Sequence, residues 1–190
     1  SFYSHHISTI EGGYILTDEA EIDSLARSIR AHGWTRDISE SSGLYEKQEN
    51  DFFEAYRFIL PAYNLRPQEI NAAVGLEQLK KLPKFTKLRR KNLTLFQSLF
   101  YDDDRFIVQR ENGKSSSFSF TIIVNPAIKV SRDHVLSKLK DANIRFRIIT
   151  GGCFTRHDVI KYYDYEVQGD LKNANLAHDY GFFVGNHPFD

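Results

Sequence analysis

The chain has 190 residues, in which 25 lysines and arginines balance 25 aspartates and glutamates. A net charge of zero, with both signs spread along the sequence, gives no electrostatic footprint for nucleic acid or an anionic membrane. Its one cysteine, Cys153, excludes an internal disulfide and a four-cysteine metal or iron–sulfur site built by this chain alone. No apolar run reaches about 18 residues and no signal-peptide pattern is present, so we expect a soluble, cytoplasmic protein.

The first part of the chain predicts a strand, a helix and a long loop. A short apolar strand is expected at Tyr14–Thr17, followed by a helix that Asp18 caps, that runs to about Ala31 and that Gly33 ends. Apolar residues at helical spacing predict the inward face of this helix: Ile22, Leu25, Ala26 and Ile29. Residues 35–60 show no clean period, so we expect a long ordered loop with one helical turn.

Two more helices are expected in the middle of the chain. Pro67 fits the first turn of a helix that extends to about Leu82, and Pro83 separates it from a third helix over Lys84–Phe100. The expected inward residues are Ile70, Ala73, Val74 and Leu79 in the former helix and Leu88, Leu95 and Leu99 in the latter.

From residue 104 onwards, strand and helix patterns alternate. Strands are expected at Phe118–Val124, Arg145–Ile149 and Phe182–Gly185, and helices at Ser131–Ala142 and Leu171–His178. This alternation predicts a small α+β domain.

The chain contains no methionine, and its first residues, SFYSHHISTIEGGYILT, read like the middle of a domain. We therefore expect it to be the later part of a longer protein. Methionines missing from the sequence as written are a second, compatible explanation.

The most informative segment is HHISTIEGG, residues 5–13. Two adjacent imidazoles, which titrate near neutral pH, precede a glycine pair that permits close approach of the backbone to a ligand. On residue type alone, ordinary loop histidines are the simpler interpretation of His5 and His6.

This segment resembles the active-site stretch of the DegT/DnrJ/EryC1/StrS sugar aminotransferases, which are PLP-dependent enzymes of the aspartate aminotransferase fold (fold type I). The resemblance continues through RAHG, residues 30–33, and YNLRPQEINAAVGL, residues 63–76. It implies an α/β fold in which residues 1–60 end the cofactor-binding large domain. Residues 61–103 would then be linking helices, and residues 104–190 the C-terminal small α+β domain.

In this family a lysine forms the Schiff base with PLP, and Glu-Gly-Gly follows six residues later. Counting back six from Glu11 reaches His5, and histidine at this position is the mark of the family's 3-dehydratases. Imidazole cannot form that stable Schiff base, so the resemblance implies that the cofactor works as pyridoxamine 5′-phosphate (PMP). We assign His5 as the base that takes a proton from the cofactor and then protonates the departing hydroxyl.

The resemblance also implies the reaction and its partners. It points to removal of the C3 hydroxyl of GDP-4-keto-6-deoxy-D-mannose in deoxysugar (colitose, O-antigen) biosynthesis. L-Glutamate would regenerate PMP, and the enzyme would be a homodimer with shared active sites. Sister dehydratases need a [2Fe–2S] cluster held by cysteines in this region, and with Cys153 alone we expect no such cluster.

Further site residues follow from the same match. Family members carry a phosphate-binding serine five residues before the lysine position. Ser1 is the candidate for it, although counting five from Ser1 reaches His6, our second candidate base. Asn64 and Arg66 match positions that reach the cofactor phosphate or substrate of the neighbouring subunit; a turn-capping asparagine and a solvated arginine are the alternatives.

Three residues are candidates for the nucleotide-sugar. His32 and Arg36 flank Trp34 in an aromatic and cationic cluster, while His32 could instead stabilise only a helix C-terminus. His187 lies in Gly-Asn-His-Pro after an apolar strand, where the family often places a substrate-contacting loop. We expect no metal site.

Two other functions stay open, namely a nucleotide-sugar aminotransferase and a non-catalytic relative that retains binding alone. The residues that hold the cofactor ring are expected in a preceding segment, so we do not expect this chain by itself to be active.

Overall fold

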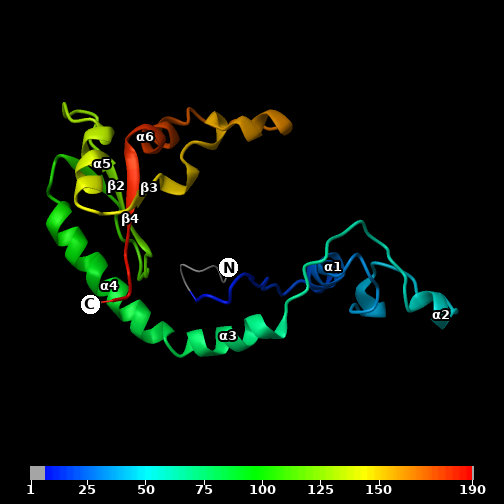
Figure 1. The fold of residues 1–190 in the computed structure, drawn as a ribbon. Helices are drawn as coiled ribbons and strands as arrows, with labels where there is room; N and C mark the ends of the chain where they lie inside the picture. Colours follow the sequence, from blue (N-terminus) through cyan, green and yellow to red (C-terminus); the bar gives the residue numbers. More distant parts are fainter. Residues whose placement is uncertain (1–6, 190) are drawn as a thin grey trace. The chain divides into compact units, whose positions relative to one another are not determined.

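The computed structural model describes residues 7–189 and separates into two compact units, the first ending at Lys80 and the second beginning at Lys81. Figure 1 shows short helices joined by long loops in the first unit and a sheet with helices in the second. The predicted assignment of residues 1–60, 61–103 and 104–190 to parts of a longer fold stays a prediction.

The helices of the first unit are α1 (Ala20–Arg30), the 3₁₀-helix η1 (Glu40–Ser42), α2 (Asp51–Glu54) and α3 (Glu69–Leu79). Helix α1 begins one residue later than predicted, because Glu19 and not Asp18 stands at its N-cap. Its predicted end is confirmed, since the Gly33 N–H donates to the Ser28 carbonyl at 2.8 Å. Gly33 has φ 79°, and a Cβ there would lie 1.9 Å from the Leu60 carbonyl oxygen, so only glycine fits.

Two predictions for this region need correction. Residues Tyr14–Thr17 do not form a strand. The predicted inward face of α1 is right only in part, since Leu25, Ala26 and Ile29 are half-buried but Ile22 is 47% exposed, and the most buried residues of the helix are Ser24 and Ser28. Small side chains on that face let the loop after α1 fold back closely against the helix.

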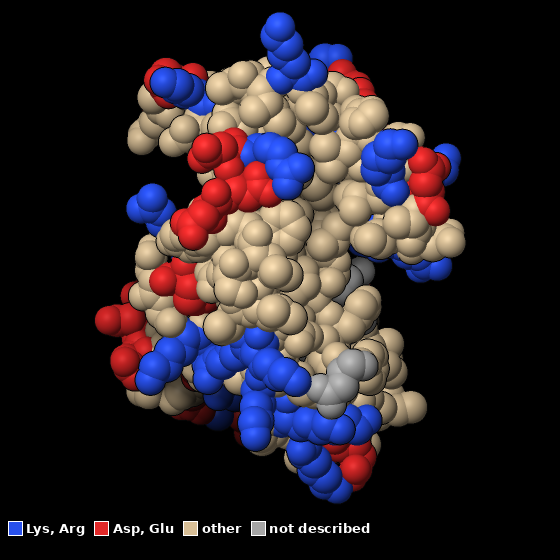
Figure 2. All heavy atoms as spheres, turned by 90° about the vertical axis from the view of Figure 1, so that its left-hand side faces the viewer, with Lys and Arg blue, Asp and Glu red and all other residues tan. Residues whose placement is uncertain are grey.

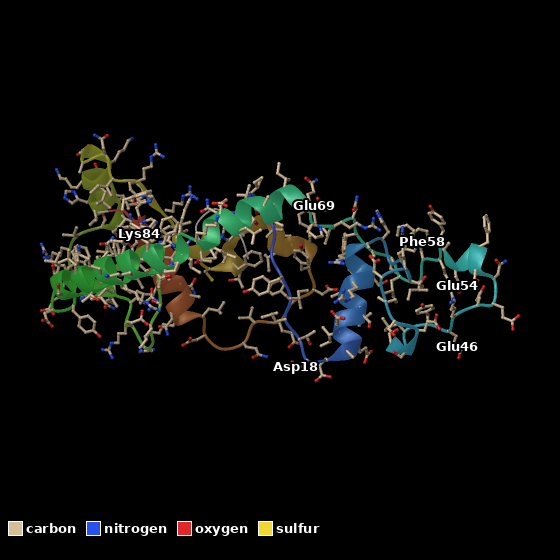
Figure 3. The ribbon with its side chains drawn as sticks, turned by 90° about the horizontal axis from the view of Figure 1, so that it is seen from below. Asp18, Glu46, Glu54, Phe58, Glu69 and Lys84 are labelled. Atoms are coloured by element: carbon tan, nitrogen blue, oxygen red, sulfur yellow. The ribbon has the colours of Figure 1, made fainter. Side chains whose placement is uncertain are left out.

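The predicted long loop contains both short helices, η1 and α2, and the Asn50 side chain caps α2 by accepting from the N–H groups of Phe52 and Phe53. The Arg57 guanidinium ties the loop together, because it donates to the Glu54 carboxylate and the Glu46 carbonyl, both at 2.7 Å. Figure 3 shows Glu46 and Glu54 in this region of the first unit.

The second unit contains an antiparallel sheet in the order β1-β2-β4-β3 and three α-helices among the described residues. The strands are β1 (Phe106–Val108), β2 (Ser119–Val124), β3 (Phe146–Arg147) and β4 (Gly181–Gly185). The helices are α4 (Leu82–Phe100), α5 (Arg132–Asp141), α6 (Lys172–Tyr180) and the 3₁₀-helices η2 (Ile149–Gly151), η3 (Phe154–Arg156) and η4 (Asp158–Tyr162).

The core of this unit lies between the sheet and helices α4 and α5. Phe96 of α4 stacks on Phe120 of β2 at 4.6 Å between ring centroids, and Val124 and Phe182 are buried beside them. The inward face predicted for the third helix is therefore wrong at two of its three residues, because Leu95 and Leu99 are 59% and 66% exposed while Leu88 is half-buried.

The predicted strand over Arg145–Ile149 is reduced to two residues. Thr150 and Gly151 have φ values of 43° and 80°, so the chain turns out of the sheet into η2 directly after Ile148. By contrast, the predicted helix at Ser131–Ala142 is confirmed, and the Ser131 side chain caps it by accepting from the His134 N–H.

Candidate nucleotide-sugar site

The first unit gathers two arginines around one tryptophan. The guanidinium carbons of Arg36 and Arg66 lie 5.3 and 5.2 Å from the centroid of the Trp34 ring. Phe58 stacks against the same ring at 5.6 Å, and the Tyr56 ring centroid lies 5.3 Å away. We call Trp34, Arg36, Arg66, Tyr56 and Phe58 the tryptophan cluster.

Backbone pairing between distant segments builds this cluster. Ala31 pairs with Asn64, and Trp34 pairs with Phe58, each in an isolated antiparallel bridge. The Trp34 indole N–H also donates to the Ala55 carbonyl at 3.1 Å. The segment of residues 31–34 is thus held beside the segment of residues 55–64.

The same pairing brings together two pairs of residues that the sequence analysis had proposed for different ligands, His32 with Arg36 and Asn64 with Arg66. His32 donates its backbone N–H to the Tyr63 carbonyl at 2.8 Å, so His32 lies beside Asn64 and both belong to the rim of the tryptophan cluster. His32, Arg36, Asn64 and Arg66 all have exposed side chains. His32 also stands two residues after the end of α1, at φ 64°.

The chemistry of this cluster fits an anion next to a flat ring. Within residues 7–189, neither Arg36 nor Arg66 has a hydrogen-bond or ion-pair partner for its guanidinium; each lies over the Trp34 ring instead. Their N–H groups are therefore free to donate to phosphate oxygens, for which the planar donor fork of arginine is suited. Trp34 and Phe58 supply apolar ring surface beside them. The residues present thus fit a phosphorylated cofactor or a nucleoside diphosphate.

The proposed catalytic residues lie at the start of the chain. Ser1, His5 and His6 fall outside the described residues. The structure does describe the segment that follows them, from Ile7 to Gly13.

His187 belongs to the second unit, where a polar network holds the backbone on both sides of its Cα. Asn186 is 2% exposed, and its amide donates to the carbonyls of Arg89 at 3.0 Å and Ser117 at 2.8 Å. The Asn92 amide donates to the Asn186 side-chain oxygen and the His187 carbonyl, both at 3.2 Å. The His187 side chain itself is exposed.

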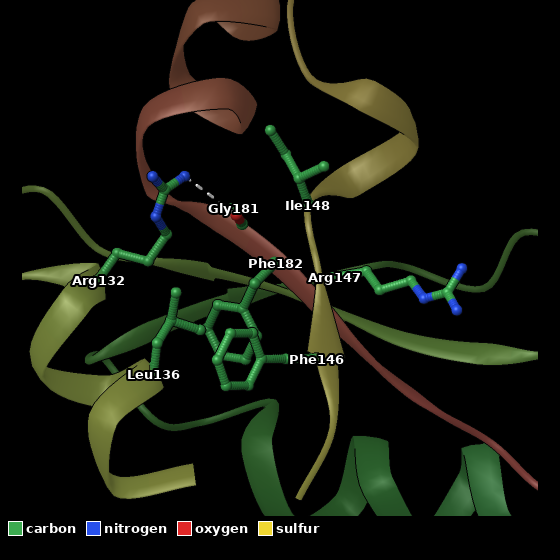
Figure 4. A pocket seen from close by; sticks show the side chains of 7 residues that line it. All are labelled: Arg132, Leu136, Phe146, Arg147, Ile148, Gly181 and Phe182. Atoms are coloured by element: carbon green, nitrogen blue, oxygen red, sulfur yellow. Dashed lines mark hydrogen bonds between the residues drawn. The ribbon is translucent and has the colours of Figure 1, made fainter. Parts of the chain in front are cut away.

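A small cavity of about 240 Å³ lies between α5 and the β3–β4 edge of the sheet. Figure 4 shows Arg132 at one side of it and Arg147 projecting away from Arg132. Arg132 donates to the carbonyls of His178 and Gly181 at the end of α6, so it acts as a cap for that helix. The sequence analysis missed Arg132, because its partners come from a distant helix end.

Figure 2 shows lysines and arginines gathered over the lower part of the face that it presents. Helix α4 contributes exposed basic residues to the second unit: Lys84, Lys87, Arg90 and Lys91. Arg90 is not free, since it donates to the carbonyls of Lys114 and Ser115. Figure 3 marks Lys84 in the first turn of this helix.

Among residues 7–189, no helix is long and apolar enough to cross a membrane. Within the same range, no group of three or more histidine, cysteine, aspartate or glutamate side chains is placed to hold a metal ion.

Sequence comparison assigns the family. The pattern of the DegT/DnrJ/EryC1/StrS aminotransferase family matches residues 1–188. The chain belongs to this family. Its fold is accordingly the later part of the PLP-dependent aminotransferase fold, as the resemblance predicted.

Its relatives include dehydratases. The chain is 42% identical to GDP-4-keto-6-deoxy-D-mannose 3-dehydratase from Yersinia pseudotuberculosis, over the whole chain and 49% of that protein. A crystal structure of GDP-4-keto-6-deoxymannose-3-dehydratase with a trapped PLP–glutamate geminal diamine is 44% identical, with a TM-score of 0.91, and is covered over 50% of its length. The chain therefore spans about half the length of these relatives.

A second structure is of ColD, the same dehydratase, with a histidine replaced by lysine and the serine directly before it replaced by asparagine. It is 43% identical to this chain, with a TM-score of 0.89, and the match covers all of this chain and 50% of that one.

Proposed function

We propose that the complete protein is a PLP/PMP-dependent dehydratase that removes the C3 hydroxyl of GDP-4-keto-6-deoxy-D-mannose, with L-glutamate regenerating PMP. The observation that carries the proposal is histidine where lysine is expected, in a chain 42% identical along its whole length to a dehydratase of that name. The trapped PLP–glutamate adduct of a 44% identical relative supports the cofactor and the amino donor.

His5 is the proposed base, and the ColD variant supports this choice over His6. In that variant the altered histidine directly follows a serine. In this chain Ser4 directly precedes His5, whereas His6 follows another histidine. The count from Glu11 leads to His5 as well.

When bound, PMP supplies an amine that condenses with the 4-keto group of the sugar and a conjugated ring that accepts electrons. The Nε2 or Nδ1 atom of His5 would take the proton from the cofactor's C4′ carbon. The same imidazolium would then give a proton to the C3 hydroxyl, which leaves as water and not as hydroxide. Such positioned acid–base catalysis accelerates a reaction by roughly 10²–10⁴-fold.

The tryptophan cluster and its rim would hold the phosphates. We assign Ser1, Asn64 and Arg66 to the cofactor phosphate, with Asn64 and Arg66 reaching it in the neighbouring subunit of a homodimer. Arg36 and His32 would contact the GDP-sugar.

His187 is a further proposed substrate contact. Its exposed imidazole stands on a backbone fixed by Asn186 and Asn92. The cytoplasmic location expected from the sequence stays a prediction.

Product analysis tests the proposal. The complete protein is incubated with PLP, L-glutamate and GDP-4-keto-6-deoxy-D-mannose, and the products are measured by mass spectrometry together with released ammonia. A 3-deoxy sugar with stoichiometric ammonia is expected. An amino-sugar without ammonia would identify an aminotransferase instead, and turnover without PLP or glutamate would reject the cofactor assignment.

A further inference from the structure

Helix α3 makes a close contact with the segment that follows the two N-terminal histidines in the sequence. Thr9 stands four residues after His5, and its side chain is buried against α3, with 7% of its surface exposed. The Asn71 amide of α3 donates to the Glu11 carbonyl at 3.0 Å. The Thr9 hydroxyl donates to the same carbonyl at 2.9 Å. The Glu11 carbonyl oxygen thus accepts hydrogen bonds from both helix α3 and Thr9.

Gly75 permits this approach. A Cβ built at Gly75 would lie 2.9 Å from the Thr9 Cγ2 methyl, closer than real Cβ atoms come to another carbon. Thr9 cannot turn that methyl away without giving up its hydrogen bond to the Glu11 carbonyl. Glycine in a helix interior is destabilising relative to alanine. Close docking of Thr9 explains why a glycine stands there.

The docked segment is strained between these contacts. Ile10 has φ 76°, in the left-handed region that β-branched residues avoid. Such a conformation persists only when its surroundings determine it, and it is common beside functional groups. Here the contacts on either side of Ile10, at Thr9 and Glu11, hold it in place.

We propose that Gly75 and Asn71 are positioning residues for His5. They fix Thr9 and Glu11, which stand four and six residues after His5 in the sequence, so a change at either Gly75 or Asn71 is expected to act on the chemical step. This proposal rests on the proposed function, in which His5 is the base.

Steric complementation in the complete protein tests the contact. Gly75→Ala adds a methyl group that clashes with Thr9. We expect kcat to fall at least about tenfold, because a small misplacement of a catalytic group lowers the rate by up to about a hundredfold. KM for the GDP-sugar should stay within about twofold. The thermal midpoint should change less than kcat, because the gain from alanine in the helix opposes the cost of the clash with Thr9. The double variant Thr9→Ser/Gly75→Ala, which lacks Cγ2 but keeps the hydroxyl, should recover the kcat of Thr9→Ser alone.

Asn71→Asp keeps the side-chain shape but removes the amide donor to Glu11, so it should lower kcat in the same way even if Gly75→Ala does not fold. Asn173→Asp on the exposed face of α6 is the matched control and should leave kcat unchanged. Wild-type kcat in both Gly75→Ala and Asn71→Asp would overturn the proposal, as would a Gly75→Ala defect that Thr9→Ser does not relieve.

The variant His5→Asn distinguishes a failure of the catalytic assignment of His5 from a failure of the positioning role of Gly75 and Asn71. If His5→Asn is inactive while Gly75→Ala and Asn71→Asp are fully active, the positioning role alone is wrong. If His5→Asn releases ammonia at the wild-type rate, the catalytic assignment of His5 fails, and the positioning role fails with it.

Discussion

The guanidinium carbon of Arg66 lies 5.2 Å from the ring centroid of Trp34, although a long loop separates the two residues in sequence. Arg36 lies at nearly the same distance from that ring, at 5.3 Å. Two guanidinium groups therefore lie over the same indole ring, and their N–H groups can donate hydrogen bonds to an anion. This relationship supports a phosphate-binding role for residues that otherwise look like ordinary surface arginines.

Arg36→Ala should weaken binding of the GDP-sugar and leave the chemical step intact. Loss of a charge-assisted contact of about 1.5–3 kcal/mol corresponds to a rise in KM of roughly tenfold to a hundredfold. Steady-state kinetics at saturating glutamate measures this change. Arg27→Ala is the matched control, because Arg27 is an exposed arginine of the same unit that pairs with Asp23. Equal KM values for the two variants would remove Arg36 from the site.

Replacing His5 should stop the reaction, whereas replacing His6 should not. His5→Asn removes the group that moves the proton, so kcat should fall by roughly 10²–10⁴-fold. His6→Asn makes the same chemical change one residue later. Ammonia release under single-turnover conditions compares the two. A larger fall in kcat for His6→Asn than for His5→Asn would make His6 the base in place of His5.

Asn186→Ala should destabilise the second unit. The change removes the buried amide that satisfies the carbonyls of Arg89 and Ser117, and leaving such groups unpaired costs about 1–3 kcal/mol. We expect the free energy of unfolding, measured in urea, to fall by about 2 kcal/mol. Asn173→Ala, at an exposed position on α6, should change it by less than about 0.5 kcal/mol. Similar values for the two variants would mean that the Asn186 network contributes little.

The pair of Asp103 and Arg105 should make the second unit sensitive to acid. Hydrogen bonds from the Arg105 side chain and backbone lower the pKa of Asp103 from 3.8 to about 2. Because the folded-state pKa is the lower one, this carboxylate stabilises the fold above pH 4, and that contribution is lost as the pH falls from 4 to 2.

Thermal unfolding between pH 6 and pH 2 tests this sign. Asp103→Asn should lower the midpoint at pH 6 and should lose less stability than the wild type between pH 4 and pH 2. Parallel pH profiles for the two proteins would contradict the assignment.

Local chemistry in the sequence was sufficient to predict most helices and strands. Ser131 predicted the start of α5, Gly33 the end of α1, and the apolar run after Phe118 a strand. Buried faces were predicted less well. Periodicity indicates that a helix forms, but which of its sides is covered depends on the partner. In α4 that partner is Phe120 of the sheet, which selects Phe96 over Leu95.

The sequence by itself determined the family and the histidine in place of lysine, because both are read from the order of residues along the chain. Only the tertiary structure decided that Arg36 and Arg66 share the Trp34 ring and that Gly75 lies against Thr9. These contacts arise when segments far apart in the chain exchange backbone hydrogen bonds or pack at van der Waals distance. Such pairings depend on how loops close in space, and local residue patterns do not encode that closure.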